Sequence, residues 1–121
     1  MVKMIIGKNN TTGQRLYKKA KNIILGGNML LSKRPEMFLP DLWPSYFSKS
    51  KNIDVWDLDK NRYIDFIFAV GQSTLGYSNS IIDKKVSKSI KRGNMTTFNC
   101  PEEVELSKKL IELHPWANMC K

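Results

Sequence analysis

The apolar residues near the start of the chain recur with the period of an amphipathic helix. Over residues 11–25 they occupy positions i, i+4, i+7 and i+8, namely Leu16, Ala20, Ile23 and Ile24. This spacing predicts a helix with one buried stripe. Thr11 or Thr12 suits its N-cap, and Gly26 and Gly27 suit its end, because glycine tolerates the left-handed conformation that follows a last helical turn.

The next stretch, residues 28–44, is rich in both proline and apolar residues. Pro35, Pro40 and Pro44 remove backbone donors and favour extended conformations before them, which argues against an α-helix or a central strand. We therefore predict an extended arm. Its apolar side chains need a surface to pack on, and they are Met29, Leu30, Leu31, Met37, Phe38, Leu39, Leu42 and Trp43.

Residues 53–57 and 62–66 have the composition of two strands joined by a turn. β-Branched and aromatic residues recur in both, Tyr46 and Phe47 precede them, and the polar residues of 58–61 supply the turn. This arrangement predicts an antiparallel hairpin.

Two further helices are predicted after the hairpin. The first begins at Asn79 or Ser80, carries a stripe of Ile82, Val86 and Ile90, and ends at Gly93. The second begins at Pro101, has leucines at helical spacing, and ends at His114–Pro115; residues 116–120 resemble the approach to a strand. The order of elements favours an α+β fold or the start of an α/β chain.

Composition limits the class of protein. The 121 residues are 41% hydrophobic, enough for one domain or part of one. Lys and Arg number 20 against 11 Asp and Glu, for a net charge of +9. The basic residues are spread over every element, so solvated helix faces are favoured over a binding groove, and a small basic nucleic-acid- or anion-binding protein stays as the alternative.

Several other functions are not supported by the sequence. No apolar run is long enough to span a bilayer, and the apolar stretch of residues 1–6 is too short for a secretory signal. With only Cys100, Cys120 and a single His114, neither a disulfide framework nor a metal cluster is expected. We expect a cytoplasmic protein without a membrane partner.

Catalytic motifs are equally sparse. The glycines match no phosphate-binding loop, His114 has no nucleophile partner, and the acidic run at Asp57–Asp59 lacks the Gly and Glu of a calcium loop. Turn and cap roles are favoured for these residues, so no catalytic, cofactor-binding or metal-binding residue is assigned.

The hairpin sequence from Val55 to Phe66, VWDLDKNRYIDF, resembles a hairpin of class III pyridoxal-phosphate-dependent aminotransferases. Upstream, Gly26–Gly27 resembles the glycine pair that opens glutamate-1-semialdehyde aminomutases. Downstream, the stretches LGY at 75–77 and CPEEVEL at 100–106 resemble further family segments in the same order. The resemblance covers nearly the whole chain, although Lys60 replaces the glycine of the family's hairpin.

The resemblance implies the α+β N-terminal lobe of a fold-type I enzyme: helix, extended arm, antiparallel hairpin and two helices. It implies pyridoxal phosphate as cofactor, a homodimer in which the apolar arm packs on the partner, and a small amino-acid or amino-sugar-type substrate. Nucleic acid is not an expected partner. It also implies five residues on the substrate side, which are Arg34, Lys33, Val70, Gly71 and Gln72; Arg34 is preferred because a guanidinium binds a carboxylate in bidentate fashion.

In this family the Schiff-base lysine and the phosphate-binding loop follow the part that matches this chain. The chain alone is therefore expected to be inactive, as the N-terminal fragment of an aminotransferase or aminomutase. Residues 1–45 would form the N-terminal helix and interface arm. Residues 46–121 would form the hairpin and helices of the small lobe, leading into a missing cofactor domain.

Overall fold

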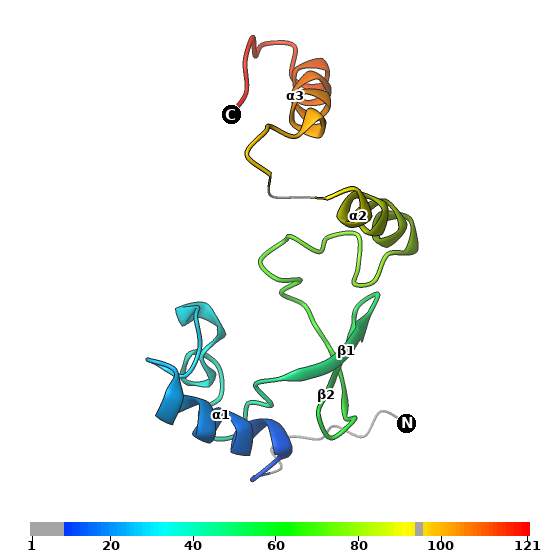
Figure 1. Ribbon diagram of the computed structural model, residues 1–121. Coiled ribbons are helices and arrows are strands. Elements are labelled where there is room, and N and C mark those ends of the chain that lie inside the picture. The colour runs from blue at the N-terminus through cyan, green and yellow to red at the C-terminus, as the bar shows by residue number, and fades with distance from the viewer. Residues whose placement is uncertain (1–8, 94–95) are drawn as a thin grey trace. The chain divides into compact units, whose positions relative to one another are not determined.

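The computed structural model describes residues 9–93 and 96–121. Within these ranges there are three α-helices, two short 3-10 helices and a three-stranded antiparallel sheet (Figure 1), which confirms the α+β expectation. The described residues divide into two compact units, one up to Asp83 and one from Lys84 to Lys121. The division at residue 45 stays a prediction. Residues 1–6, on which the exclusion of a secretory signal depends, lie outside the described residues.

Helix α1 (Thr12–Ile23) begins and ends within two residues of the predicted bounds. Thr11 and Gln14 form a reciprocal capping box, in which each side chain accepts a hydrogen bond from the other's backbone N–H. The predicted stripe was only partly right. The buried face consists of Gly13, Gln14, Tyr17 and Ala20, whereas Leu16 and Ile23 are exposed, because the arm covers the helix on the side of Tyr17.

The arm contains two turns that the sequence did not predict, η1 (Leu31–Lys33) and η2 (Pro35–Met37). The arm is therefore not extended throughout, although residues 28–44 contain neither an α-helix nor a strand, as predicted. Pro35 begins η2, where its fixed φ suits a helical turn and its missing N–H has no partner to lose. Phe38 stacks on Trp43 with ring centroids 4.4 Å apart.

The sheet has the order β1-β2-β3, formed by β1 (Phe47–Lys51), β2 (Asp54–Asp57) and β3 (Arg62–Ile64). Strands β2 and β3 pair antiparallel, with Val55 opposite Tyr63, as the predicted hairpin requires. The sequence missed most of β1, because its serines and lysines lack the apolar alternation of a strand with one buried face.

Helix α2 (Ser80–Arg92) is capped by the Asn79 side chain, which accepts a hydrogen bond from the Ile81 N–H at 3.1 Å. Helix α3 (Pro101–Leu113) begins at Pro101, as predicted. Residues 116–121, whose sequence resembles the approach to a strand, contain no helix or strand, and the Trp116 ring makes an edge contact with His114. None of the helices within the described ranges has the length and apolarity needed to cross a membrane.

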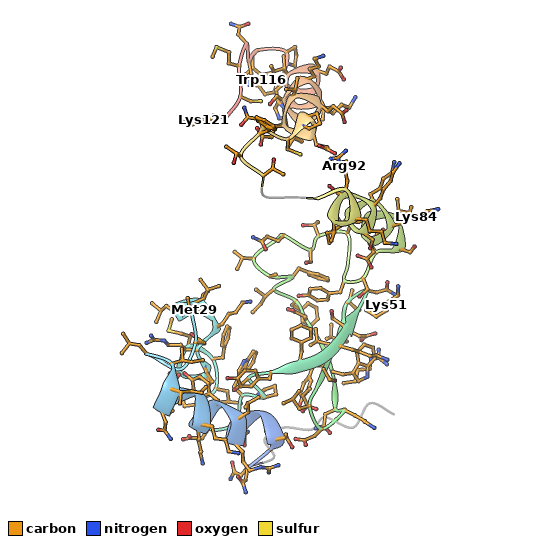
Figure 2. All side chains as sticks on the ribbon, in the orientation of Figure 1. Met29, Lys51, Lys84, Arg92, Trp116 and Lys121 are labelled. Carbon is orange, nitrogen blue, oxygen red and sulfur yellow. The ribbon has the colours of Figure 1, made fainter. Side chains whose placement is uncertain are left out.

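The interior is small. Among the described residues, Tyr17 and Ala20 are the buried hydrophobic residues, and Gln14 and Asp57 are the buried polar ones. Apolar side chains of the arm stay exposed; Met29, labelled in Figure 2, is 91% exposed. The stripes of α2 and α3 are also partly exposed, so most of the predicted apolar faces have no partner within the described chain.

Candidate functional site

The candidate site is the loop that follows β3 and leads into α2. Both of its ends are attached to the turn between β1 and β2. The Asp65 N–H donates to the carbonyl oxygen of Ile53 at 2.9 Å, and Tyr77 exchanges two backbone hydrogen bonds with Asn52 at 2.8 and 2.9 Å. The loop of residues 66–76 is thus closed at its base by the sheet.

Asp65 and Tyr77 also join the two ends through their side chains. The Tyr77 hydroxyl donates to Asp65 Oδ2 at 2.5 Å. The other oxygen, Asp65 Oδ1, accepts from the backbone N–H groups of Ile67 at 2.8 Å and Phe68 at 3.2 Å. The Phe68 ring stacks on Tyr77 with centroids 5.8 Å apart.

These contacts shift the pKa values of Asp65 and Tyr77. Burial, and then the hydrogen bond to the Asp65 carboxylate, raise the pKa of Tyr77 to about 12. Burial alone would raise the pKa of Asp65, but the hydrogen bonds from Tyr77, Ile67 and Phe68 outweigh it and lower that pKa below its ordinary value. The pair is therefore a carboxylate and a neutral phenol at neutral pH.

The loop contains a run of left-handed backbone. Phe68, Ala69, Val70 and Gly71 have φ values of 49°, 51°, 60° and 85°. This conformation costs an L-residue about 1–2 kcal/mol, and Val70 is the least suited because it is β-branched. Such strain persists only where the surrounding contacts fix it, and it concentrates at functional sites.

A pocket of about 270 Å³ lies between this loop and the first turn of α2. It is lined by Gly71, Gln72, Ser73, Thr74, Leu75, Gly76, Tyr77, Ser78, Asn79, Ile82 and Asp83. The lining combines apolar surface, from residues such as Leu75 and Ile82, with the hydroxyl and amide groups of Ser73, Thr74 and Asn79, which can hydrogen-bond to a ligand. Within the described residues, no group of three or more His, Cys, Asp or Glu side chains is placed to hold a metal.

The pocket residues do not fit the covalent attachment of pyridoxal phosphate. That cofactor requires a lysine for its Schiff base, and the described residues that line the pocket include no lysine, arginine or histidine. The loop can therefore contribute binding surface to a cofactor or substrate, but it supplies no amine to bond with the cofactor aldehyde.

The structure distributes the predicted substrate residues over two places. Gly71 and Gln72 line the pocket, while Val70 is 83% exposed and is not among the lining residues. Lys33 is exposed at the end of η1. Arg34 follows it and packs its guanidinium against Gly26, where an added Cβ would lie 2.0 Å from Arg34 Nη2. Arg34 and Lys33 thus lie in the arm, and Gly71 and Gln72 lie at the pocket.

Arg34 has one further property. Its Nε atom is buried and has no hydrogen-bond partner, and the same holds for the Asn28 Oδ1 atom. Nearby, Tyr17 donates to Glu36 Oε2 at 3.0 Å, and Lys21 lies 3.6 Å from Glu36 Oε1. Burial and Glu36 together raise the pKa of Tyr17. The carboxylate of Glu36 is thus engaged by Tyr17 and Lys21, while the buried Arg34 Nε–H has no hydrogen-bond partner.

Sequence reasoning missed the pairing of Asp65 with Tyr77. Both residues lie in stretches that resemble the family, the hairpin VWDLDKNRYIDF and the turn LGY. Nothing in the sequence joins them, because they are 12 positions apart and meet only when the loop closes on the sheet.

Comparison with known proteins supports the resemblance seen in the sequence. No family model matches the chain. The chain is 37% identical over 106 residues to a 3-aminobutyryl-CoA aminotransferase of Cloacimonas acidaminovorans, covering 86% of this chain and 25% of that protein. It is 30% identical over 113 residues to a glutamate-1-semialdehyde 2,1-aminomutase of Methanothrix thermoacetophila, covering 93% of this chain and 25% of the relative.

The fold of this chain is also similar to solved structures of such enzymes. The FumI protein of Sphingopyxis sp. MTA144, in its pyridoxal-phosphate internal aldimine form, superposes with a TM-score of 0.78 at 27% identity, over 92% of this chain and 27% of its own. A β-phenylalanine aminotransferase of Variovorax paradoxus shares the fold, with a TM-score of 0.74 at 23% identity.

The homologues of this chain are thus pyridoxal-phosphate-dependent enzymes of the aminotransferase class, and the fold is that of part of such an enzyme. More specifically, they are class III aminotransferases and glutamate-1-semialdehyde aminomutases, which confirms the family predicted from the sequence. Pyridoxal phosphate is the cofactor of this family. The chain spans about a quarter of the length of the curated relatives that it matches.

Proposed function

We propose that this chain is the N-terminal part of a pyridoxal-phosphate-dependent class III aminotransferase or glutamate-1-semialdehyde-type aminomutase. The observation that carries the proposal is the agreement of sequence and fold over nearly the whole chain, at 37% identity to one relative and a TM-score of 0.78 to another. When bound in a complete enzyme, the cofactor supplies the electron sink for moving an amino group. The residues described here supply binding surface.

Within that enzyme, Arg34 is proposed to bind the carboxylate of an amino-acid-type substrate, with Lys33 beside it and Val70, Gly71 and Gln72 on the substrate side. The buried, unpartnered Nε of Arg34 supports this role, because an orphaned buried donor is costly until a partner reaches it. A carboxylate satisfies two guanidinium N–H groups at once.

We further propose a homodimer and a cytoplasmic location for the complete enzyme. The exposed apolar residues of the arm, among them Met29, Leu30 and Leu31, support a partner surface. The cysteines, Cys100 and Cys120, are both free and exposed, which suits a reducing compartment.

A hybrid enzyme tests the activity. The stretch of the Cloacimonas aminotransferase that aligns with this chain is replaced by the residues of this chain, and amino transfer is measured. We expect a hybrid that retains its cofactor and transfers an amino group. A hybrid that is folded by circular dichroism and retains the cofactor, yet transfers no amino group from any donor tried, would contradict the proposal.

Two variants of that hybrid test the carboxylate site. Arg34→Ala is expected to raise KM for a carboxylate substrate by about tenfold or more, because a charge-assisted contact contributes about 1.5–3 kcal/mol. Lys19→Ala is the control, since it removes an exposed lysine charge on α1 that is not among the proposed substrate residues, and its KM should change less than about twofold. Equal effects of the two variants would argue against a specific role for Arg34.

A further inference from the structure

We propose that Asp65 and Tyr77 are positioning residues, whose hydrogen bond holds the loop of residues 66–76 in the conformation that forms the pocket. The proposal rests on the proposed function only in treating this pocket as part of the substrate side. The atoms that meet a ligand would be those of the loop, and the pair would act through them.

The Asp65 carboxylate is shared between the two ends of the loop. One oxygen accepts from the backbone N–H groups of Ile67 and Phe68, where the left-handed run begins. The other accepts from the Tyr77 hydroxyl at the far end. A single side chain therefore fixes the entry of the loop and ties it to the exit.

The backbone of Tyr77 is also held by the turn between β1 and β2. Its backbone N–H donates to the Asn52 carbonyl oxygen at 2.8 Å and its carbonyl accepts from the Asn52 N–H at 2.9 Å. Gly76, with φ of +88°, lets the chain approach closely, because a Cβ there would lie 3.2 Å from Asn52 Cα. The hydroxyl of Tyr77 consequently reaches Asp65 from a fixed backbone position.

The pocket depends on the conformation that the pair fixes. Inside the loop, the Val70 N–H donates to the Ile67 carbonyl oxygen at 3.0 Å, and the Ser73 N–H donates to that of Phe68 at 3.2 Å. Thr74 Oγ1 donates to the carbonyl oxygen of Gly71 at 2.5 Å. These bonds exist only while Phe68 to Gly71 stay left-handed, and residues from Gly71 onward form the pocket wall.

The primary test uses the full 121-residue chain and residue-resolved amide hydrogen exchange. Tyr77→Phe removes the hydroxyl but keeps the ring against Phe68 and the backbone bonds to Asn52. We expect the amides of Ile67, Phe68 and Ser73 to exchange about tenfold or more faster, while those of Val55 in the sheet stay unchanged.

Asp65→Asn, and the double variant that combines it with Tyr77→Phe, complete a double-mutant cycle. If the pair acts as one unit, the double variant should open the loop hardly more than either single variant. Tyr63→Phe is the matched control, because it removes the same kind of bond, from a tyrosine hydroxyl to Asp57 at 3.1 Å, in the hairpin turn. It should leave the exchange of residues 66–76 unchanged.

A second readout separates positioning from a general structural role. In the hybrid enzyme, Tyr77→Phe is expected to raise KM for the amino substrate about threefold or more, with kcat changed less. Unchanged exchange at Ile67 and Phe68, loss of protection across the sheet as well as the loop, or an active hybrid with unchanged KM would each overturn the proposal. A hybrid without any activity counts against the proposed function, and the exchange data still decide whether the pair holds the loop.

Discussion

Asp57 is the acidic residue most deeply embedded in the described chain, with 3% of its surface exposed. Its Oδ1 accepts from the backbone N–H groups of Asp59 at 2.9 Å and Asn61 at 2.8 Å. Its Oδ2 accepts from Asn61 Nδ2 at 2.9 Å and from the Tyr63 hydroxyl at 3.1 Å. A buried carboxylate is tolerated only with such partners, so Asp57 organises the turn between β2 and β3.

Removing this carboxylate should destabilise the hairpin strongly. Asp57→Ala leaves several donors without an acceptor, and we expect the free energy of unfolding to fall by about 3 kcal/mol. Asp54→Ala is the control, because Asp54 pairs with the exposed Arg62 side chain at the other end of β2. It should cost less than about 1 kcal/mol. Urea denaturation followed by circular dichroism measures both, and similar losses would refute the assigned role.

Lys60 occupies the left-handed conformation in the same turn, with φ of 64°. Lys60→Gly should therefore raise the free energy of unfolding by about 1 kcal/mol, because glycine adopts this conformation without a steric penalty. Lys60→Ala removes the charge and the long side chain but keeps Cβ, so it should bring no such gain. Thermal melts of both variants separate backbone strain from charge, and a gain in the alanine variant alone would point to charge.

At the scale of elements, α1 is positioned by contacts at its first turn. The Thr12 N–H donates to Asp59 Oδ2 at 2.8 Å, and the Thr12 hydroxyl donates to Asp59 Oδ1. A carboxylate at a helix N-terminus also interacts favourably with the helix dipole. Next to it, Gly13 lies against the backbone of Pro44, where the arm ends. The hairpin turn and the arm thus both meet the start of α1.

Gly13→Ala tests this close approach. Alanine favours a helix over glycine by about 1 kcal/mol, yet the new Cβ would lie 1.8 Å from the carbonyl oxygen of Pro44. We expect the clash to dominate and to lower the free energy of unfolding by about 1–3 kcal/mol. Asn22→Ala, on the exposed end of α1, should be neutral or stabilising. A stabilised Gly13→Ala variant would show that α1 and the arm do not pack as described.

Helices α2 and α3 show which features of an element follow from local sequence. Their starts and ends at Asn79, Gly93 and Pro101 were predicted, because caps and proline act within one turn of the chain. The buried face of α1 was not predicted correctly. It depends on contacts of the Tyr17 hydroxyl with Glu36 of the arm and with Gly26 after the helix, and neither periodicity nor composition specifies these contacts.

At the scale of the molecule, two part-buried tyrosine–aspartate pairs, Tyr63 with Asp57 and Tyr77 with Asp65, give the first compact unit a defined pH dependence. Burial and a carboxylate partner raise the pKa of Tyr63 and of Tyr77 to about 12, against an unfolded value of about 10. The folded state holds these protons more tightly. Their contribution to stability is therefore complete below about pH 10 and is lost as pH rises through about 12.

We therefore expect the free energy of unfolding to fall from about pH 10 upward, and the near-ultraviolet absorbance of phenolate to develop late. Replacing both residues, as Tyr63→Phe with Tyr77→Phe, should reduce this dependence. The part that remains belongs in part to Tyr17, whose pKa is also raised. An alkaline profile unaffected by the double replacement would exclude the two pairs as its cause.

The small interior of the described residues agrees with the short span of the chain relative to its curated relatives. The described residues bury two hydrophobic side chains and leave many large ones exposed, and the chain spans a quarter of the length of its curated relatives. The exposed stripes of α2 and α3 suit packing against further protein surface, as proposed for a complete enzyme.

By itself the sequence determined the features that arise from neighbouring residues: the helix limits, the hairpin turn, the α+β class and the resemblance to a family of cofactor-dependent enzymes. Caps, turns and proline act over a few positions, so they can be recognised directly. Only the tertiary structure decided that Thr12 meets Asp59 across 47 positions and that Asp65 meets Tyr77 across 12. Such contacts depend on how the chain closes loops, and the shape of the pocket depends on them.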